Sequence, residues 1–198
     1  MVTSVLLPKS KTIRELENIF REMLCLIFRI DTDDPGRIQF GWSRKDESVP
    51  KVYDGNVCYI MLTPIDDNYN RLRDIRYVDE GGRDMVTYDE HTDVYEVQFV
   101  NYGTEAVESA KTIRAGLHSD RVRRFLRIHK IALITDVPAV VRLPEINGGG
   151  WTNRADLRAR FNVFVRLVDE MKTYERVRAE VITEDGNRRK FEVGNEFY

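Results

Sequence analysis

Three acidic residues and one histidine lie close together in the sequence, namely Asp89, Glu90, His91 and Asp93. These residue types could bind a divalent metal ion or act as a general acid and base. A metal or acid/base centre would need further groups, and the sequence has no second cluster to supply them. The position suits the end of a β-hairpin, so we expect a solvated turn there. An enzyme that binds a divalent metal at residues 89–93 is the alternative.

The other candidates for chemistry are weaker. His118 and His129 have no Glu or Asp at metal-ligand spacing, which indicates histidines at the surface or at helix ends. The glycines at 148–150 precede a strand, whereas a phosphate-binding loop leads into a helix. No residue has nucleophile-elbow spacing, and Cys25 and Cys58 lie in apolar runs typical of reduced core thiols. We therefore predict no catalytic residue, no metal and no cofactor, and thus not an enzyme.

One basic segment, RVRRFLRIHK at residues 121–130, has the spacing of an amphipathic helix. Arginines along a helix can contact DNA phosphates without reading the base sequence. Such a run can equally be a solvated face that is paired with neighbouring acidic groups. The net charge of -2 argues against a general nucleic-acid binder. A small nucleic-acid-binding module that acts through this helix stays as an alternative function.

The composition is that of a globular protein with a charged surface, since 42% of the 198 residues are hydrophobic and 32% are charged. This length suits one domain, which we expect at residues 1–183. Residues 184–198 would form a C-terminal extension that is mobile or that orders only on assembly. No apolar run approaches the roughly 20 residues that a membrane span needs, so we expect no membrane partner. Reduced cysteines and the lack of a signal peptide indicate a protein made in the cytosol.

The element that organises the chain is a long strand near residues 151–170. Odd-numbered residues from 157 to 167 are apolar and most even-numbered ones are polar or charged, which is the pattern of a strand with one buried face. The charged face carries Arg158, Arg160 and Arg166. It is either an ordinary solvated sheet face or a docking surface for another chain.

The remaining pattern predicts an α+β fold, with an antiparallel, partly extended sheet covered by an N-terminal helix and a central helix pair. Residues 57–62 read as a central strand buried on both faces, and residues 94–100 as a further strand. A charged hairpin at residues 71–88, turning at 81–82, contains Arg76, which joins the candidate docking surface. The helix starts follow from capping residues, namely Thr12 with Glu15, Thr104, and Ser119 or Asp120.

Three stretches between residues 97 and 165 follow a recognisable order: FVNYGTEAVESAKTIRAGL, SDRVRRFLRIHKIALITDVPAVVRLPEI and WTNRADLRARFNVFV. A strand ending in a Tyr-Gly pair leads to a helix with an Ile-Arg pair, a short helix, a proline-bearing segment, an aromatic residue and the long strand. The residues are Tyr102, Gly103, Ile113, Arg114, Pro138, Leu143, Pro144, Glu145, Trp151, Arg154, Ala155, Asp156, Leu157 and Phe161. This arrangement resembles the neck or tail terminator (tail completion) proteins of tailed bacteriophages, and the order of elements extends the likeness over residues 13–182.

The resemblance implies a structural virion protein that forms a homo-oligomeric ring, a hexamer, on the end of the tail tube. Such a ring would stop tube growth and join the tube to the head-tail connector or adaptor proteins, with DNA passing through its bore without sequence recognition. The sheath protein would be a further partner if the tail is contractile. The protein would be located at the neck or the top of the tail, after assembly in the host cytoplasm. Combined with the charged strand face, the hairpin and the basic helix described above, this suggests Arg76, Arg158, Arg160 and Arg166 for a subunit or tube interface, and Arg121, Arg124 and Arg127 for a lumen or DNA-facing surface.

Overall fold

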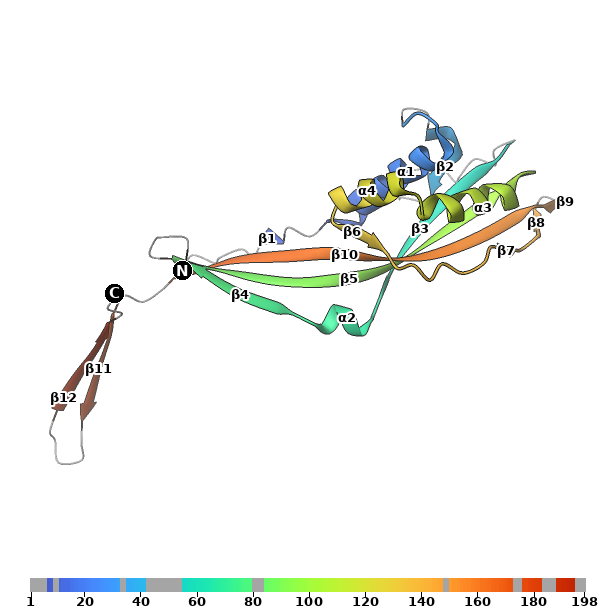
Figure 1. Ribbon diagram of the computed structural model, residues 1–198. Helices are drawn as coiled ribbons and strands as arrows, with labels where there is room; N and C mark the ends of the chain where they lie inside the picture. The colour runs from blue at the N-terminus through green and yellow to red at the C-terminus, as the bar shows by residue number, and fades with distance from the viewer. Residues whose placement is uncertain are drawn as a thin grey trace. The chain divides into compact units, whose positions relative to one another are not determined.

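A computed structural model of the protein describes residues 7–8, 11–32, 35–41, 55–79, 84–147, 150–172, 176–182 and 188–194 (Figure 1). The chain divides into two compact units, which are treated separately below. The larger unit comprises residues 10–73 and 91–165, and the smaller unit comprises residues 1–9, 74–90 and 166–198.

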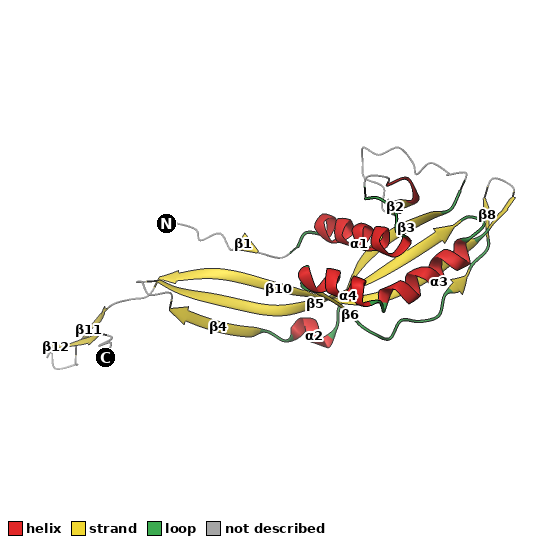
Figure 2. Cartoon of the chain, turned by 45° about the horizontal axis from the view of Figure 1, so that its top comes forward, coloured by secondary structure: helices red, strands yellow, loops and turns green. Residues whose placement is uncertain are grey.

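The chain contains short strands, a few helices and two strands of unusual length, β5 and β10 (Figure 2). In chain order they are β1 (Leu7–Pro8), α1 (Ile13–Phe28), η1 (Pro35–Arg37), β2 (Ile38–Phe40), β3 (Val57–Ile65), α2 (Asn68–Arg71), β4 (Asp74–Asp79), β5 (Asp84–Tyr102), α3 (Ala106–Leu117), α4 (Asp120–Ile128), β6 (Ile131–Leu133), β7 (Val141–Arg142), β8 (Glu145–Asn147), β9 (Gly150–Thr152), β10 (Arg154–Lys172), β11 (Arg176–Ile182) and β12 (Arg188–Gly194).

The main sheet has the strand order β1-β10-β5-β3-β2, with β4 added to β5 and with β6 and β7 added to β10. Among the described strand pairs with a defined register, β2 and β3 are parallel and the others are antiparallel. Strand β10 has the predicted alternation, because its odd-numbered residues from 155 to 165 are buried whereas Arg158 and Arg160 are exposed. Strand β3 is central as predicted, although Tyr59 and Met61 on one of its faces are only half-buried.

Helix α1 begins at the predicted capping box. The Glu15 backbone N–H donates to the Thr12 hydroxyl at 3.2 Å, and the Thr12 N–H donates to the Glu15 carboxylate at 2.7 Å. These bonds satisfy two of the N–H groups that a helix start leaves without partners. The helix ends at Arg29, which adopts the left-handed conformation with φ 57°. Its buried stripe, which includes Phe20 and Leu24, faces the sheet and the other helices.

Helices α3 and α4 lie with α1 on one face of the sheet in the larger unit (Figures 1 and 2). Arg114 of α3 attaches the proline-bearing segment to this layer, since its guanidinium donates to the backbone carbonyls of Val137 and Pro138 at 3.1 and 3.0 Å. Between the layers lies a continuous apolar core, in which Cys25 and Cys58 are buried free thiols, as predicted. The predicted α+β fold, an antiparallel sheet covered by one N-terminal helix and a helix pair, is therefore confirmed.

Two local predictions were wrong. The residues at 89–93 do not form a turn, because β5 runs without interruption from Asp84 to Tyr102. Thr104 does not cap α3, whose N-cap is Glu105. The Glu105 N–H instead donates to the side-chain oxygen of Asn56 at 2.9 Å, so a residue distant in sequence replaces the local cap.

The smaller unit consists of strands. Strand β4 pairs with the first part of β5 in an antiparallel register from Asp74↔Glu90 to Asp79↔Met85, as the predicted hairpin requires. Its predicted turn at 81–82 lies outside the described residues. Strand β1 pairs with β10 at Leu7↔Val168. Strands β11 and β12 form a separate two-stranded sheet, and β12 is an element that the sequence pattern did not predict.

Candidate assembly interface

In the larger unit, the charged face of β10 lies beside an acidic residue of the neighbouring strand. The guanidinium groups of Arg158 and Arg160 lie 3.7 and 3.5 Å from the Glu96 carboxylate of β5. Both arginines are exposed, and ion pairs in water contribute only about 0 to 1 kcal/mol. This face therefore adds little to the stability of the chain. It carries charges that a partner chain could contact.

The other two predicted interface arginines meet in the smaller unit. The Arg166 guanidinium lies 2.5 Å from the Glu90 carboxylate, and the Arg76 guanidinium lies 2.6 Å from Asp74 and 3.9 Å from Glu90. Arg166 also lies over the ring of Tyr88, 5.4 Å from its centroid. The two arginines, far apart in sequence, thus share one acidic residue on β5. The sequence pattern alone could not show this.

Helix α4 carries the predicted basic face. Ser119 caps it, and its Val122 and Leu126 are buried, as the sequence pattern predicted. Arg121, Arg124 and Arg127 are exposed and follow one another at three-residue spacing. Within the described part of the chain, no acidic side chain lies within ion-pair distance of these three arginines. They differ in this respect from the arginines of β10, since their charge is not neutralised locally.

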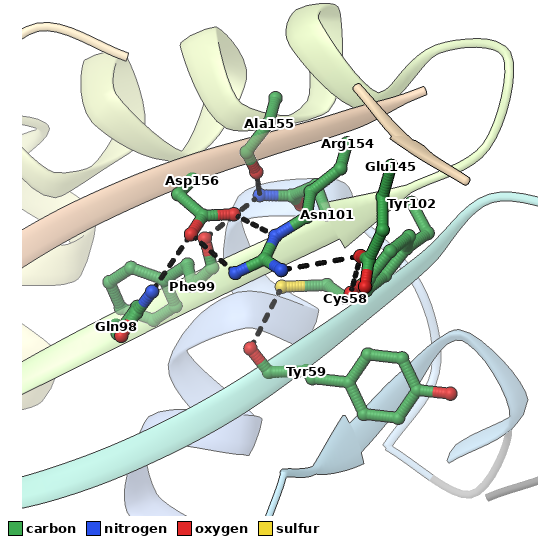
Figure 3. Close-up of polar contacts among 10 residues, drawn as sticks. All are labelled: Cys58, Tyr59, Gln98, Phe99, Asn101, Tyr102, Glu145, Arg154, Ala155 and Asp156. Carbon is green, nitrogen blue, oxygen red and sulfur yellow. Dashed lines mark hydrogen bonds and ion pairs between the residues drawn. The ribbon is translucent and has the colours of Figure 1, made fainter. Parts of the chain in front are cut away.

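A partly buried polar network connects the ends of β5 and β10 in the larger unit (Figure 3). The Arg154 guanidinium donates twice to the Asp156 carboxylate, at 2.8 Å in each case. Asp156 also accepts from the side-chain amide of Gln98 at 2.8 Å. Arg154 and the Tyr102 hydroxyl both donate to Glu145, at 3.3 and 2.9 Å. Hydrogen bonds that involve a charged group are the strong ones, so this network holds the residues around it in place.

The surroundings of two groups in the network favour the protonated forms that donate these hydrogen bonds. Burial, followed by the hydrogen bond to Glu145, raises the pKa of Tyr102 to about 12. The hydrogen bonds to Asp156 raise the pKa of Arg154 above its ordinary value. Tyr102 therefore stays neutral and donates at neutral pH, while Arg154 stays charged. Both residues belong to the pattern on which the family resemblance rests, as do Glu145 and Asp156, so this part of the pattern forms one connected network.

The turn between β5 and α3 is held by two buried or close-packed positions. Gly103 has φ 113°, which disfavours any residue with a Cβ atom. A Cβ atom there would also lie 2.3 Å from the Asn56 side-chain oxygen. Asn101 is buried, and its amide donates to the backbone carbonyl of Ala155 at 3.3 Å. Asn101 thus joins β5 to β10, and Gly103 allows the turn that leads into α3.

Next to this network, strands β8 and β9 expose large apolar side chains. Ile146 and Trp151 are register partners in the β8–β9 hairpin, and 64% and 74% of their surface is exposed. Val141 and Leu143, on the segment before β8, are also exposed. Contiguous exposed apolar residues commonly mark protein–protein contacts. The sequence pattern did not predict this surface, although Ile146 and Trp151, on either side of the glycines at 148–150, were a usable signal.

The acidic cluster forms no metal centre in the described residues. His91 and Asp93 lie in the larger unit, in the interior of β5, where the His91 ring lies 3.5 Å from the Asp93 carboxylate and 3.2 Å from the Arg73 guanidinium. Across the described residues, no group of three or more His, Cys, Asp or Glu side chains could hold a metal ion. His118 and His129 are the C-cap residues of α3 and α4, as the sequence predicted.

Exposed charged strand faces, a basic helix and an exposed apolar hairpin are surfaces through which a protein can contact other chains. Among the described residues, no helix is long and apolar enough to cross a membrane. The chain belongs to the phage neck terminator protein family, whose model matches residues 14–187. A comparison with curated proteins found no match. The family is one of structural virion components with a role in tail completion, and it implies contacts with other phage tail and head-tail proteins.

Proposed function

We propose that this chain caps the tail tube and joins it to the head-tail connector or adaptor proteins as a ring of six copies through which DNA passes. The tail tube protein, the connector and, in a contractile tail, the sheath protein are its proposed partners. Its place is the neck of the virion, after assembly in the host cytoplasm. It acts as a structural protein without a cofactor.

The observation that carries this proposal is the set of surfaces that the fold leaves available for contact. A subunit of a ring needs two different contact surfaces, because a head-to-tail contact that is repeated by rotation closes the ring. The larger unit offers the arginines of β10 beside Glu96 and, separately, the apolar pair Ile146 and Trp151. We assign Arg158 and Arg160, and in the smaller unit Arg76 and Arg166, to contacts with a neighbouring subunit or with the tube.

The basic face of α4 supports the DNA-facing part of the proposal. A bore that passes DNA benefits from diffuse positive charge, because tight phosphate binding by many subunits would hold the genome in place. Arg121, Arg124 and Arg127 are exposed and have no acidic partner in the described residues. We assign them to the lumen or to its opening on the head side.

A triple replacement tests this assignment. Changing Arg121, Arg124 and Arg127 to Gln should leave ring assembly and tube capping intact while lowering the yield of DNA-filled particles in a complementation assay. The matched control replaces the exposed cations Arg14, Arg37 and Lys111 with Gln, which removes the same charge elsewhere and should leave the yield unchanged.

Sedimentation and negative-stain images report assembly separately from particle yield. Lost assembly in the α4 variant would show that these arginines contact a neighbouring subunit instead. Intact rings with unchanged particle yield would exclude a role for α4 in DNA handling.

The same unpaired arginines support a second candidate, a small nucleic-acid-binding module that acts through residues 121–130. This function predicts that the monomer shifts duplex DNA in moderate salt. Three phosphate contacts would give a slope of log affinity against log salt of about -3. A monomer without measurable DNA affinity would exclude this candidate and would leave the ring proposal unaffected, since a ring acts through many weak contacts at once.

A further inference from the structure

The β11–β12 hairpin has the pattern of a sheet with one apolar face. The register pairs Val177 with Val193 and Ala179 with Phe191, so apolar residues occupy the same alternate positions in both strands. Two of the intervening pairs, Arg178↔Glu192 and Glu180↔Lys190, join opposite charges, and the apolar alternation ends at Val181↔Arg189. Among the described strands, no other strand pairs with this hairpin. A two-stranded hairpin alone is marginally stable in water, so this one needs a further strand or surface.

Strand β4 has an edge that no other described strand covers. In the described part of the chain it pairs with β5 only, which leaves its other edge open. Ile75 and Tyr77 have 52% and 60% of their surface exposed, and Val78 is exposed as well. An open edge with exposed apolar residues is a template for pairing with another chain. This edge therefore needs a cover.

The two elements also have complementary charges. Strand β4 with residues 84–90 of β5 contains five acidic residues and one basic residue, whereas β11 and β12 together contain five basic and two acidic residues. Arg166, which pairs with Glu90, offsets only part of the acidic excess. Opposite potentials favour the correct partner and guide its approach.

We propose that the β11–β12 hairpin of one subunit docks on the β4 edge of a neighbouring copy of this chain. Backbone hydrogen bonds along β4 supply the contact, as in recognition by strand addition, and the apolar positions of the hairpin cover the exposed residues of β4. The two contact surfaces differ, so repetition of the contact generates a ring. This inference rests on the proposed ring, and it gives the C-terminal segment a role as the link between subunits.

Cross-linking between differently tagged full-length chains tests the contact. One preparation carries Val193→Cys and the other carries Tyr77→Cys. The two are mixed, either in solution or in the presence of purified tail tubes, and the mixture is treated with a short bismaleimide. The native thiols, Cys25 and Cys58, are buried and should react little. The matched control combines Val193→Cys with Lys111→Cys, which is exposed on α3. Val177→Cys, the register partner of Val193, repeats the test from the other strand.

The expected result is a cross-linked product that carries both tags when Val193→Cys is mixed with Tyr77→Cys. The mixture of Val193→Cys with Lys111→Cys should not give this product. The contact between subunits is refuted if the two mixtures give equal amounts of product. It is also refuted if a single chain that carries both Val193→Cys and Tyr77→Cys is linked internally while the mixture of singly substituted chains gives no product. Tube capping by the unsubstituted chain, seen in negative stain, reports the proposed function separately. Rings and capping without the cross-link would overturn the hairpin contact alone, whereas a chain that never caps tubes would overturn the function.

Discussion

Phe161→Ala is the substitution that most directly tests the register of β10. Phe161 is fully buried, and its ring centroid lies 4.7 Å from that of Phe20 on α1, with the rings tilted by 56°. The side chain thus joins the sheet to the N-terminal helix in the larger unit. Removing it takes away apolar burial and leaves a cavity that the surrounding core cannot fill completely.

The expected loss in the free energy of unfolding is about 3 to 5 kcal/mol. Its upper half is favoured because the contact with Phe20 adds about 0.5 to 1.5 kcal/mol to the burial term. With a urea m-value of about 2 to 3 kcal/mol per molar, the midpoint of the urea transition should fall by about 1 to 2.5 M. Circular dichroism and tryptophan fluorescence measure the shift.

The matched control is Arg160→Ala, one residue earlier on the opposite face of the same strand. Arg160 is exposed, and its 3.5 Å contact with Glu96 is a surface ion pair. The free energy of unfolding should therefore change by less than about 0.5 kcal/mol. Equal losses in the two variants would refute the assignment of buried and exposed faces. A larger loss for Arg160 would reverse that assignment.

Two further predictions concern the network and the interface. The pKa of Tyr102 is raised from 10.0 to about 12 in the folded state, so the folded chain holds that proton more tightly than the unfolded chain, and stability should fall as pH rises from 10 to 12. Tyr102→Phe should remove this part of the decline, as urea midpoints across that pH range will show, and an unchanged decline would contradict the raised pKa. Reversing the charges of Arg158 and Arg160 to Glu should give a folded chain that fails to form rings or cap tubes, since like charges across an interface cost several kcal/mol. The same reversal at Arg14 and Lys111 should preserve capping, and normal capping by the first variant would remove this face of β10 from the interface.

Much of the fold was predictable because the controlling interactions are local. The capping box of Thr12 and Glu15 lies within four residues, and the alternation along β10 records directly which face is buried. The Ser119 cap of α4 and the two histidines at helix ends are also local features. In each case the sequence neighbours are also the physical partners.

The wrong predictions occurred where a distant residue replaces the local partner. The charges at 89–93 indicated a turn, yet antiparallel pairing with β4 and then β3 keeps β5 extended on both sides of them. Thr104 had the right residue type for a cap, but Asn56, far earlier in the chain, accepts the bond at the start of α3. Strand β12 has few apolar residues, and its pairing with β11 is what identifies it.

The candidate interface divides in the same way. The sequence alone determined that arginines line one face of β10 and the outer side of α4, because strand and helix periodicity fix which residues share a face. Only the tertiary structure decided that Arg76 and Arg166 share Glu90, that Arg154 joins Asp156 to Glu145, and that the arginines of α4 have no acidic partner in the described residues. These contacts join segments separated by many residues, and electrostatic energy depends on distance in space. The order of residues along the chain does not contain that information.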